Sequence, residues 1–121
     1  MNGTDGWPSE WLRATLALCV LGVLQDDSGH GYLVAARLAE AGLGEVKGGT
    51  LYPILARLED SGWVASAWEP GVGGPGRKVF HLTDAGRARL HEQRAEWTDF
   101  VDVTRAVLGA AEHRGSGLSV S

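Results

Sequence analysis

The chain has 121 residues, the size of one small domain, and 44% of them are apolar, enough to form a hydrophobic core. Its formal net charge is −4, whereas nucleic-acid-binding domains are usually basic. Residues 28–83 carry five basic and five acidic side chains, so any contact with nucleic acid must depend on where the charges lie. No apolar run reaches the roughly 18 residues of a membrane span and no secretory pattern begins the chain, so we expect a cytoplasmic protein.

The first predicted helix begins at Ser9, a suitable N-cap residue, and ends at Leu24. From Trp11 onward its residues are apolar on almost every side, which is typical of a helix packed between other elements. Cys19 is the only cysteine, which excludes an intramolecular disulfide, and we interpret it as a core residue in a reducing compartment. Residues 1–8, with two glycines and a proline, are expected to be flexible.

Two further helices are predicted, one over residues 30–41 and one within residues 47–63. In the latter, Thr50 is expected to cap the first turn, and Pro53 is expected to lie in that turn, where its missing N–H costs little. Gly62 can adopt the left-handed conformation that ends a helix. Three leucines at helical spacing predict the buried face: Leu51, Leu55 and Leu58.

A β-hairpin is predicted to follow the third helix. Residues 63–68 are of strand-forming types, and residues 69–76 contain four glycines and two prolines, which indicates a loop. Residues 77–83 then alternate in polarity with the period of a half-buried strand. The two basic residues Arg77 and Lys78 therefore lie just after the tip of the hairpin.

A long final helix is predicted from a cap at Thr83 to about Glu112. Its apolar stripe consists of Leu90, Trp97, Val101 and Leu108, widened by Phe100, Val103 and Val107. A small monomer has nothing left to cover such a stripe, so a second copy of the chain is expected to pack against it. The Gly/Ser-rich tail, residues 113–121, is expected to be disordered.

These elements predict a mainly α-helical fold with a small β-wing, namely a winged helix-turn-helix plus one long C-terminal dimerisation helix. The predicted organisation is a flexible N-terminus at 1–8, a winged-helix domain at 9–83, a dimerisation helix at 84–112 and a tail at 113–121.

An ordered set of motifs resembles the PadR family of bacterial winged-helix repressors. The resemblance covers roughly Leu12 to Leu108, and the single terminal helix is similar to the short subfamily, which includes multidrug-binding regulators. The matching motifs are Gly49-Thr50-Leu51-Tyr52-Pro53, Arg57-Leu58-Glu59, Gly62-Trp63, Gly76-Arg77-Lys78, Phe80 and Leu82-Thr83-Asp84-Ala85-Gly86.

The resemblance implies a homodimer that binds a two-fold symmetric DNA operator and represses a neighbouring gene, often one for an efflux pump. It places the third helix in the major groove and the wing near the flanking minor groove. The implied DNA-binding residues are Lys47, Thr50, Leu51, Tyr52, Arg57, Arg77 and Lys78. His30 and Tyr32, at the start of the second helix, are candidates for backbone contacts or ordinary surface residues. Two alternatives stay open: Tyr52 can pack against the wing, and Arg57 can pair with Asp60.

The resemblance also implies an effector site at the centre of the dimer, where Trp97 would stack on a flat molecule. Alternatively, the indole is simply part of the apolar core of the interface. Further candidates for lining such a site are Trp7, Trp11, Gln93, Arg94 and Phe100. Gln93 and Arg94 replace apolar residues of the drug-binding members, which favours an anionic or hydrogen-bonding effector, whereas Asp99 and Asp102 would suit a cation.

No catalytic motif, metal-ligand spacing or cofactor-binding loop is recognisable, so an enzyme is not predicted. Two other functions remain open. A winged-helix protein-interaction module that never binds DNA would explain the acidic balance, and a DNA-binding regulator could act without any small-molecule effector.

Overall fold

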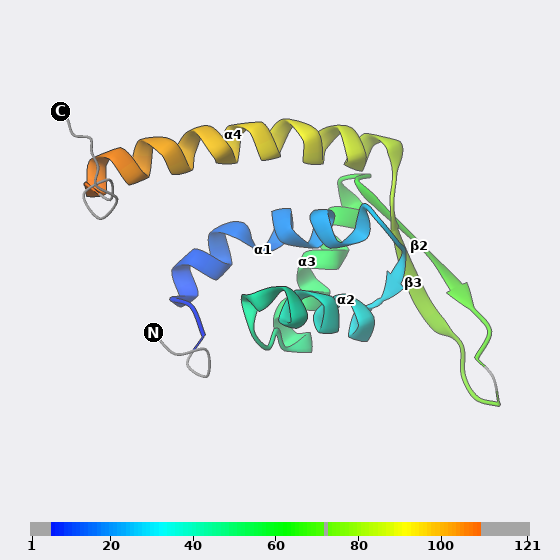
Figure 1. Ribbon diagram of the computed structural model, residues 1–121. Helices are drawn as coiled ribbons and strands as arrows, with labels where there is room; N and C mark the ends of the chain where they lie inside the picture. The colour runs from blue at the N-terminus through cyan, green and yellow to red at the C-terminus, as the bar shows by residue number, and fades with distance from the viewer. Residues whose placement is uncertain (1–5, 72, 110–121) are drawn as a thin grey trace. The chain divides into compact units, whose positions relative to one another are not determined.

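The computed structural model describes residues 6–71 and 73–109. Its elements are α1 (Ser9–Leu24), β1 (Gly29–His30), α2 (Gly31–Leu38), a π-helical turn η1 (Ala39–Leu43), α3 (Gly48–Asp60), β2 (Val64–Glu69), β3 (Arg77–Leu82) and α4 (Asp84–Leu108) (Figure 1). The chain divides into two compact units, one up to Leu90 and one from His91 onward, so α4 begins in the first unit and continues in the second. The predicted fold class, mainly helical with a small β-wing, is confirmed.

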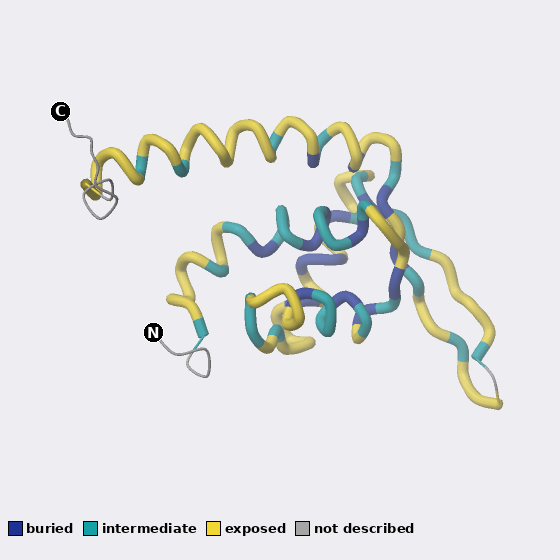
Figure 2. The backbone as a smooth tube through the Cα atoms, viewed as in Figure 1, coloured by how far each residue is buried: buried dark blue, intermediate teal, exposed yellow. Residues whose placement is uncertain are grey.

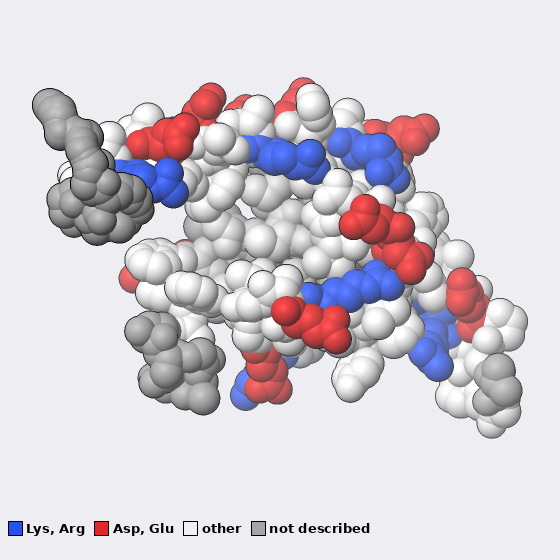
Figure 3. Space-filling model, viewed as in Figure 1, with Lys and Arg blue, Asp and Glu red and all other residues white. Residues whose placement is uncertain are grey.

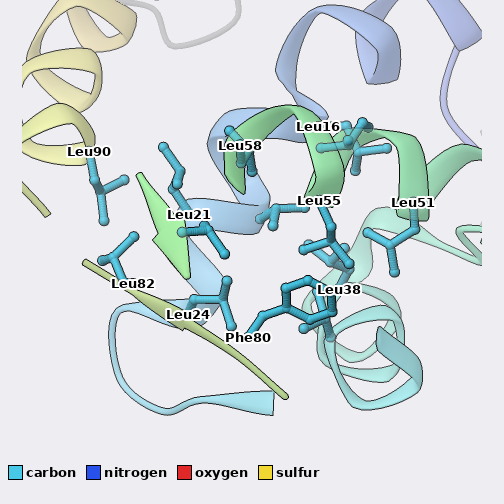
Figure 4. Close-up of a cluster of buried hydrophobic side chains, with 14 residues drawn as sticks. Leu16, Leu21, Leu24, Leu38, Leu51, Leu55, Leu58, Phe80, Leu82 and Leu90 are labelled. Atoms are coloured by element: carbon cyan, nitrogen blue, oxygen red, sulfur yellow. The ribbon is translucent and has the colours of Figure 1, made fainter. Parts of the chain in front are cut away.

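The hydrophobic core of the first unit lies between α1, α2, α3, the hairpin and the start of α4 (Figure 4). The three leucines predicted from helical spacing, Leu51, Leu55 and Leu58, are almost fully buried. The backbone in Figure 2 is buried where these helices face one another and exposed along the outer part of the hairpin. Cys19 packs against the core but is only half-buried, and this burial raises the pKa of its thiol.

The sheet has three antiparallel strands in the order β1-β3-β2, one more than the predicted hairpin. Gly29 pairs with Phe80 and His30 with Val79, while Val64 through Glu69 pair with Leu82 through Arg77. His30, expected near the start of the second helix, belongs to β1 and is also the N-cap of α2, whose first residue is Gly31. A two-residue strand leaves no periodic signal, and only the pairing with a distant strand defines it.

Helix starts differ from the predictions. Ser9 is the first residue of α1, after Pro8 in the N-cap position, and no side chain caps this helix. In α3 the cap position belongs to Lys47 and the helix begins at Gly48, so Thr50 is its third residue and does not cap it. Pro53 consequently lies in the second turn. The carbonyl of Gly49, left without its usual amide partner four residues on, is on the exposed face, where water can bind it.

The junction between the hairpin and α4 has the predicted caps. The Thr83 hydroxyl accepts a hydrogen bond from the Gly86 amide at 2.9 Å and donates one to the Gly62 carbonyl at 2.7 Å. Gly62 has φ +81°, the left-handed conformation expected after α3. Gly86 packs so closely on the Trp63 carbonyl that a Cβ atom at this position would overlap it. This contact fixes the first turn of α4 on the hairpin.

The described part of α4 ends at Leu108, followed by Gly109 with φ +73°. The predicted helix end at Glu112, the tail at 113–121 and the first five residues of the predicted flexible N-terminus lie outside the described residues. Among the described residues, no helix combines the length and apolarity that crossing a bilayer requires.

Candidate nucleic-acid interface

The outer face of α3 is exposed and carries small residues at its centre. Tyr52 and Arg57 lie at its two edges, and between them are Gly49, Pro53 and Ala56, all exposed. A face of this kind lets the helix backbone come close to a partner. Leu51, included among the implied DNA contacts, is wrong as a side-chain contact: it is 1% exposed, because it belongs to the buried leucine face of the same helix.

Tyr52 packs across the start of α2 while remaining half exposed. Its ring and hydroxyl lie so near Gly31 that a Cβ atom there would overlap them. Gly31 is itself buried, so the absence of a side chain at this position allows the phenol to lie against α2. The phenol remains accessible, and its hydroxyl can donate to an acceptor on a partner.

A shallow groove lies where the hairpin meets β1 and the start of α2; we call it the wing-base groove, and its volume is about 550 Å³. It brings together five of the predicted residues from four elements, β1, α2, α3 and β3, and two residues that were not predicted. Its lining consists of His30, Gly31, Tyr32, Tyr52, Trp68, Arg77 and Lys78. Trp68 is 69% exposed and stands opposite Lys78 in the sheet register. An exposed tryptophan on a predicted strand was the sequence signal that could have identified it.

The two basic residues of the wing-base groove have different partners. Lys78 pairs with Glu59, Nζ to Oε1 3.4 Å, and lies over the Phe80 ring. The Ser66 hydroxyl donates to Glu59 at 2.6 Å and, together with Lys78, holds the pKa of this carboxyl below its usual range. Arg77 instead donates from Nη1 to His30 Nε2 at 2.7 Å. Lys78 is therefore partly neutralised by a carboxylate, whereas Arg77 is held by an uncharged acceptor.

A second groove, about 480 Å³ in volume, runs between α1 and α3. Lys47, Thr50 and Arg57, all predicted to contact DNA, lie along it together with Arg13 of α1. The alternative pair of Arg57 with Asp60 is not formed within the described part of the chain. Arg13 was missed as a site residue because its proximity to α3 depends on packing between helices. Its charge within an otherwise apolar helix was the available signal.

Charges on the described surface are mixed rather than segregated. In the view of Figure 3, blue basic side chains lie among red acidic ones, and on this face no single basic patch dominates the described residues. This distribution agrees with the equal numbers of basic and acidic residues in 28–83. Attraction of a polyanion must accordingly come from local clusters such as the two grooves.

The residues predicted to bind an effector lie on two different units. Trp97 and Phe100 of α4 are neighbours, with ring centroids 5.8 Å apart, and are 40% and 61% exposed. Gln93 and Arg94 are on the preceding turn of the same helix, whereas Trp11, 60% exposed, is on α1. Their shared role in ligand binding remains a prediction.

Leu90 was predicted to lie in the dimer interface, and this was wrong. It is 4% exposed and belongs to the core of the first unit (Figure 4). The apolar stripe that stays exposed on α4 begins farther along, with Trp97, and includes Phe100, Val103, Val107 and Leu108.

Three helices followed by a β-wing, with aromatic and basic side chains gathered where that wing meets β1 and α2, define a winged helix-turn-helix regulator. The comparison with protein families agrees: the chain belongs to the transcriptional regulator PadR-like family, whose profile matches residues 20–92. The resemblance inferred from the motifs is thus confirmed. Membership in a family of transcriptional regulators also confirms that the chain is not an enzyme.

Individual relatives support the same assignment. The chain is 38% identical over 104 residues to the transcriptional regulator Rv3488 of Mycobacterium tuberculosis, which covers 86% of this chain and 92% of the relative. A PadR family transcriptional regulator from Eggerthella lenta is 35% identical, with a TM-score of 0.75 over 82% of this chain and 86% of that one. A PadR-like regulator from Bacillus cereus, 25% identical, has a TM-score of 0.73 over 88% and 99%.

Proposed function

We propose that this regulator is a homodimeric repressor that binds an inverted-repeat DNA operator and is released by a small-molecule effector at the dimer interface. The observation that carries the proposal is the apolar stripe on α4. Four large apolar side chains on this one helix are 61–80% exposed: Phe100, Val103, Val107 and Leu108. So much apolar surface in contact with water is unusual for a small protein unless another surface covers it.

A second copy of α4 is the natural cover for this stripe. Trp97, Val101, Thr104 and Leu108 follow one another at steps of four, three and four residues, the spacing at which two helices form a coiled-coil seam. Contact between identical helices gives a two-fold axis. Two winged-helix units related by that axis would present a pair of α3 helices to one DNA duplex.

The proposed DNA contacts are divided between α3 and the wing-base groove. The small-residue face of α3 suits the major groove, while Tyr32, Tyr52 and Arg77 offer donors to phosphates. Two α3 helices must be about 34 Å apart to enter successive major grooves. An effector that binds one arrangement of the α4 pair more tightly would shift the dimer away from this spacing.

Two measurements test the proposal. Sedimentation at micromolar concentration should give a dimer, and footprinting on the DNA upstream of the gene should reveal two protected half-sites related by inversion. A monomer, or protection without symmetry, would contradict operator binding by a dimer. For the effector, flat aromatic compounds should quench tryptophan fluorescence in the wild type, and the quench should be lost in Trp97→Phe.

A second candidate function is supported by the charge balance. Residues 28–83 have no net charge, and Lys78 is paired with Glu59, which suits a winged-helix module that binds another protein. Salt separates the two functions, because DNA binding releases counterions and weakens steeply as salt is added. Binding to DNA that is absent at low salt, or insensitive to salt, favours the protein-interaction module.

A further inference from the structure

We propose that His30 and Arg77 form a paired phosphate-binding site, in which the bond between them in the free protein is exchanged for bonds to a DNA phosphate. The inference rests on the proposed DNA binding. It gives His30 a role that its position at the start of α2 does not suggest by itself, namely to hold the Arg77 guanidinium until a phosphate takes its place.

The pair is formed by strand pairing across 47 residues of sequence. His30 stands opposite Val79 in the register of β1 and β3, and Arg77 precedes Val79 by two residues on β3, so its side chain is on the same face of the sheet. The Arg77 Nη1 atom is 2.7 Å from His30 Nε2. The ring of His30 also stacks on the exposed Tyr32, with centroids 6.3 Å apart, which fixes its orientation in the groove.

Both nitrogens of the His30 ring face hydrogen-bond donors. Nε2 faces the Arg77 guanidinium, and Nδ1 lies 3.3 Å from the backbone nitrogen of Leu33, in the first turn of α2. A guanidinium and a backbone amide can only donate, and a neutral imidazole has a single lone pair to accept with. His30 therefore makes one of the two bonds at a time: it either holds Arg77 or caps α2.

The bond to Arg77 is the stronger of the two in the free protein, because it is shorter and its donor is charged. In that tautomer Nε2 accepts and Nδ1 carries the proton, so the hydrogen bond that caps α2, from the Leu33 amide to Nδ1, is lost. A phosphate in the wing-base groove removes this conflict by accepting from Arg77. His30 can then carry its proton on Nε2 and donate it to the phosphate, while Nδ1 accepts from Leu33 and caps the helix.

Two of the cations near this position are already held by carboxylates. Lys78 is held by Glu59, and on the far side of β1 the Arg37 guanidinium, beside Gly29, is paired with Asp27. Glu69 stands opposite Arg77 in the register of β2 and β3, without an ion pair to it within the described residues. The other titratable side chains lining the groove are Tyr32 and Tyr52. Arg77 is thus the cation of the groove that no carboxylate of the described residues holds within 4 Å.

The proposal separates the two groups by charge. Arg77 brings a full positive charge to the phosphate, so its loss should flatten the plot of log affinity against log salt by up to about 0.9. His30 contributes a neutral N–H donor, so its loss should weaken binding about three- to tenfold and leave the salt slope close to the wild-type value.

The test measures binding of a fluorescein-labelled, random-sequence DNA duplex by anisotropy at several salt concentrations. Arg77→Gln should lose up to about 0.9 of the salt slope, whereas His30→Ala should lose affinity without that change in slope. His81→Ala is the matched control, since His81 is an exposed histidine on the same strand as Arg77. It should keep the wild-type affinity. Wild-type affinity in His30→Ala would overturn the proposal.

A second measurement needs no DNA. The ¹⁵N chemical shifts of the His30 ring report which nitrogen carries the proton. We expect Nδ1–H in the wild type and a shift toward Nε2–H in Arg77→Gln, where the cap of α2 has no competitor. The same tautomer in both proteins would refute the His30–Arg77 exchange even if DNA binds. If the wild type binds no duplex at low salt, the proposed DNA function fails, and the ring shifts still decide whether the pair exists.

Discussion

Replacing Gly31 by alanine should move Tyr52 off α2 and weaken DNA binding without unfolding the protein. A Cβ atom at this position overlaps the hydroxyl and ring of Tyr52, which form the outer end of a side chain that can rotate into solvent. The strain is therefore relieved by loss of the Tyr52 contact, and the main chain of α2 need not shift.

The cost follows from the burial of Tyr52, which is 51% exposed. Burial of a whole tyrosine covers roughly 200 Å², so about 100 Å² is covered here and the contact is worth at most about 2.5 kcal/mol. We expect Gly31→Ala to lower the free energy of unfolding by about 1–2 kcal/mol, since rotation of the ring leaves part of its area covered. In DNA binding, loss of one positioned phosphate donor should cost roughly 1 kcal/mol, or about fivefold in affinity.

The assay is a double-mutant cycle with Tyr52→Ala, followed by urea denaturation and by DNA anisotropy. If Gly31→Ala acts through the phenol, its cost should largely disappear when Tyr52 is already alanine. Additive costs in both backgrounds would refute this reasoning, because they would mean that the new methyl group strains the backbone of α2 instead. Gly22→Ala is the control for the general effect of replacing a helical glycine by alanine, since a Cβ atom there meets nothing within 4 Å.

Three further outcomes follow from particular contacts. In Gly86→Ala the new methyl group would overlap a backbone carbonyl that cannot rotate away, so this variant should be about 3 kcal/mol less stable in urea denaturation. Gly22→Ala should be about 0.5–1 kcal/mol more stable than the wild type. Equal effects of the two substitutions would contradict the close packing at Gly86. Because the pKa of Glu59 is lowered in the folded protein, its contribution to stability is present above its ordinary pKa and is lost as the pH falls through the lowered value. Glu59→Gln should therefore destabilise at pH 7 and have no effect in acid, and it should steepen the salt dependence of DNA binding by freeing Lys78; a pH-independent loss of stability would exclude the ion pair as the cause. Val107→Lys should yield monomers in sedimentation because a charge would enter the exposed apolar stripe of α4 that a second copy is proposed to cover, and an unchanged dimer would place the interface elsewhere.

Local sequence patterns predicted most of the helices and strands of this chain. The spacing of Leu51, Leu55 and Leu58 predicted the buried face of α3, and the caps at Gly62 and Thr83 were both recognisable, because each depends on residues within one or two turns. The glycine- and proline-rich tip of the hairpin was predicted for the same reason. These features depend on backbone preferences and helical periodicity, which act over a few residues.

The site depended on contacts between residues far apart in the chain. Strand β1, the pairing of His30 with Arg77 and the placement of Trp68 beside Lys78 arise when β3 aligns with two other segments, and no local pattern encodes that alignment. Likewise, Leu90 shares its helical stripe with Trp97, yet it packs into the core of the first unit. Periodicity shows which residues lie on one face of a helix, but it does not show which surface covers that face, since coverage is settled only when the whole chain packs.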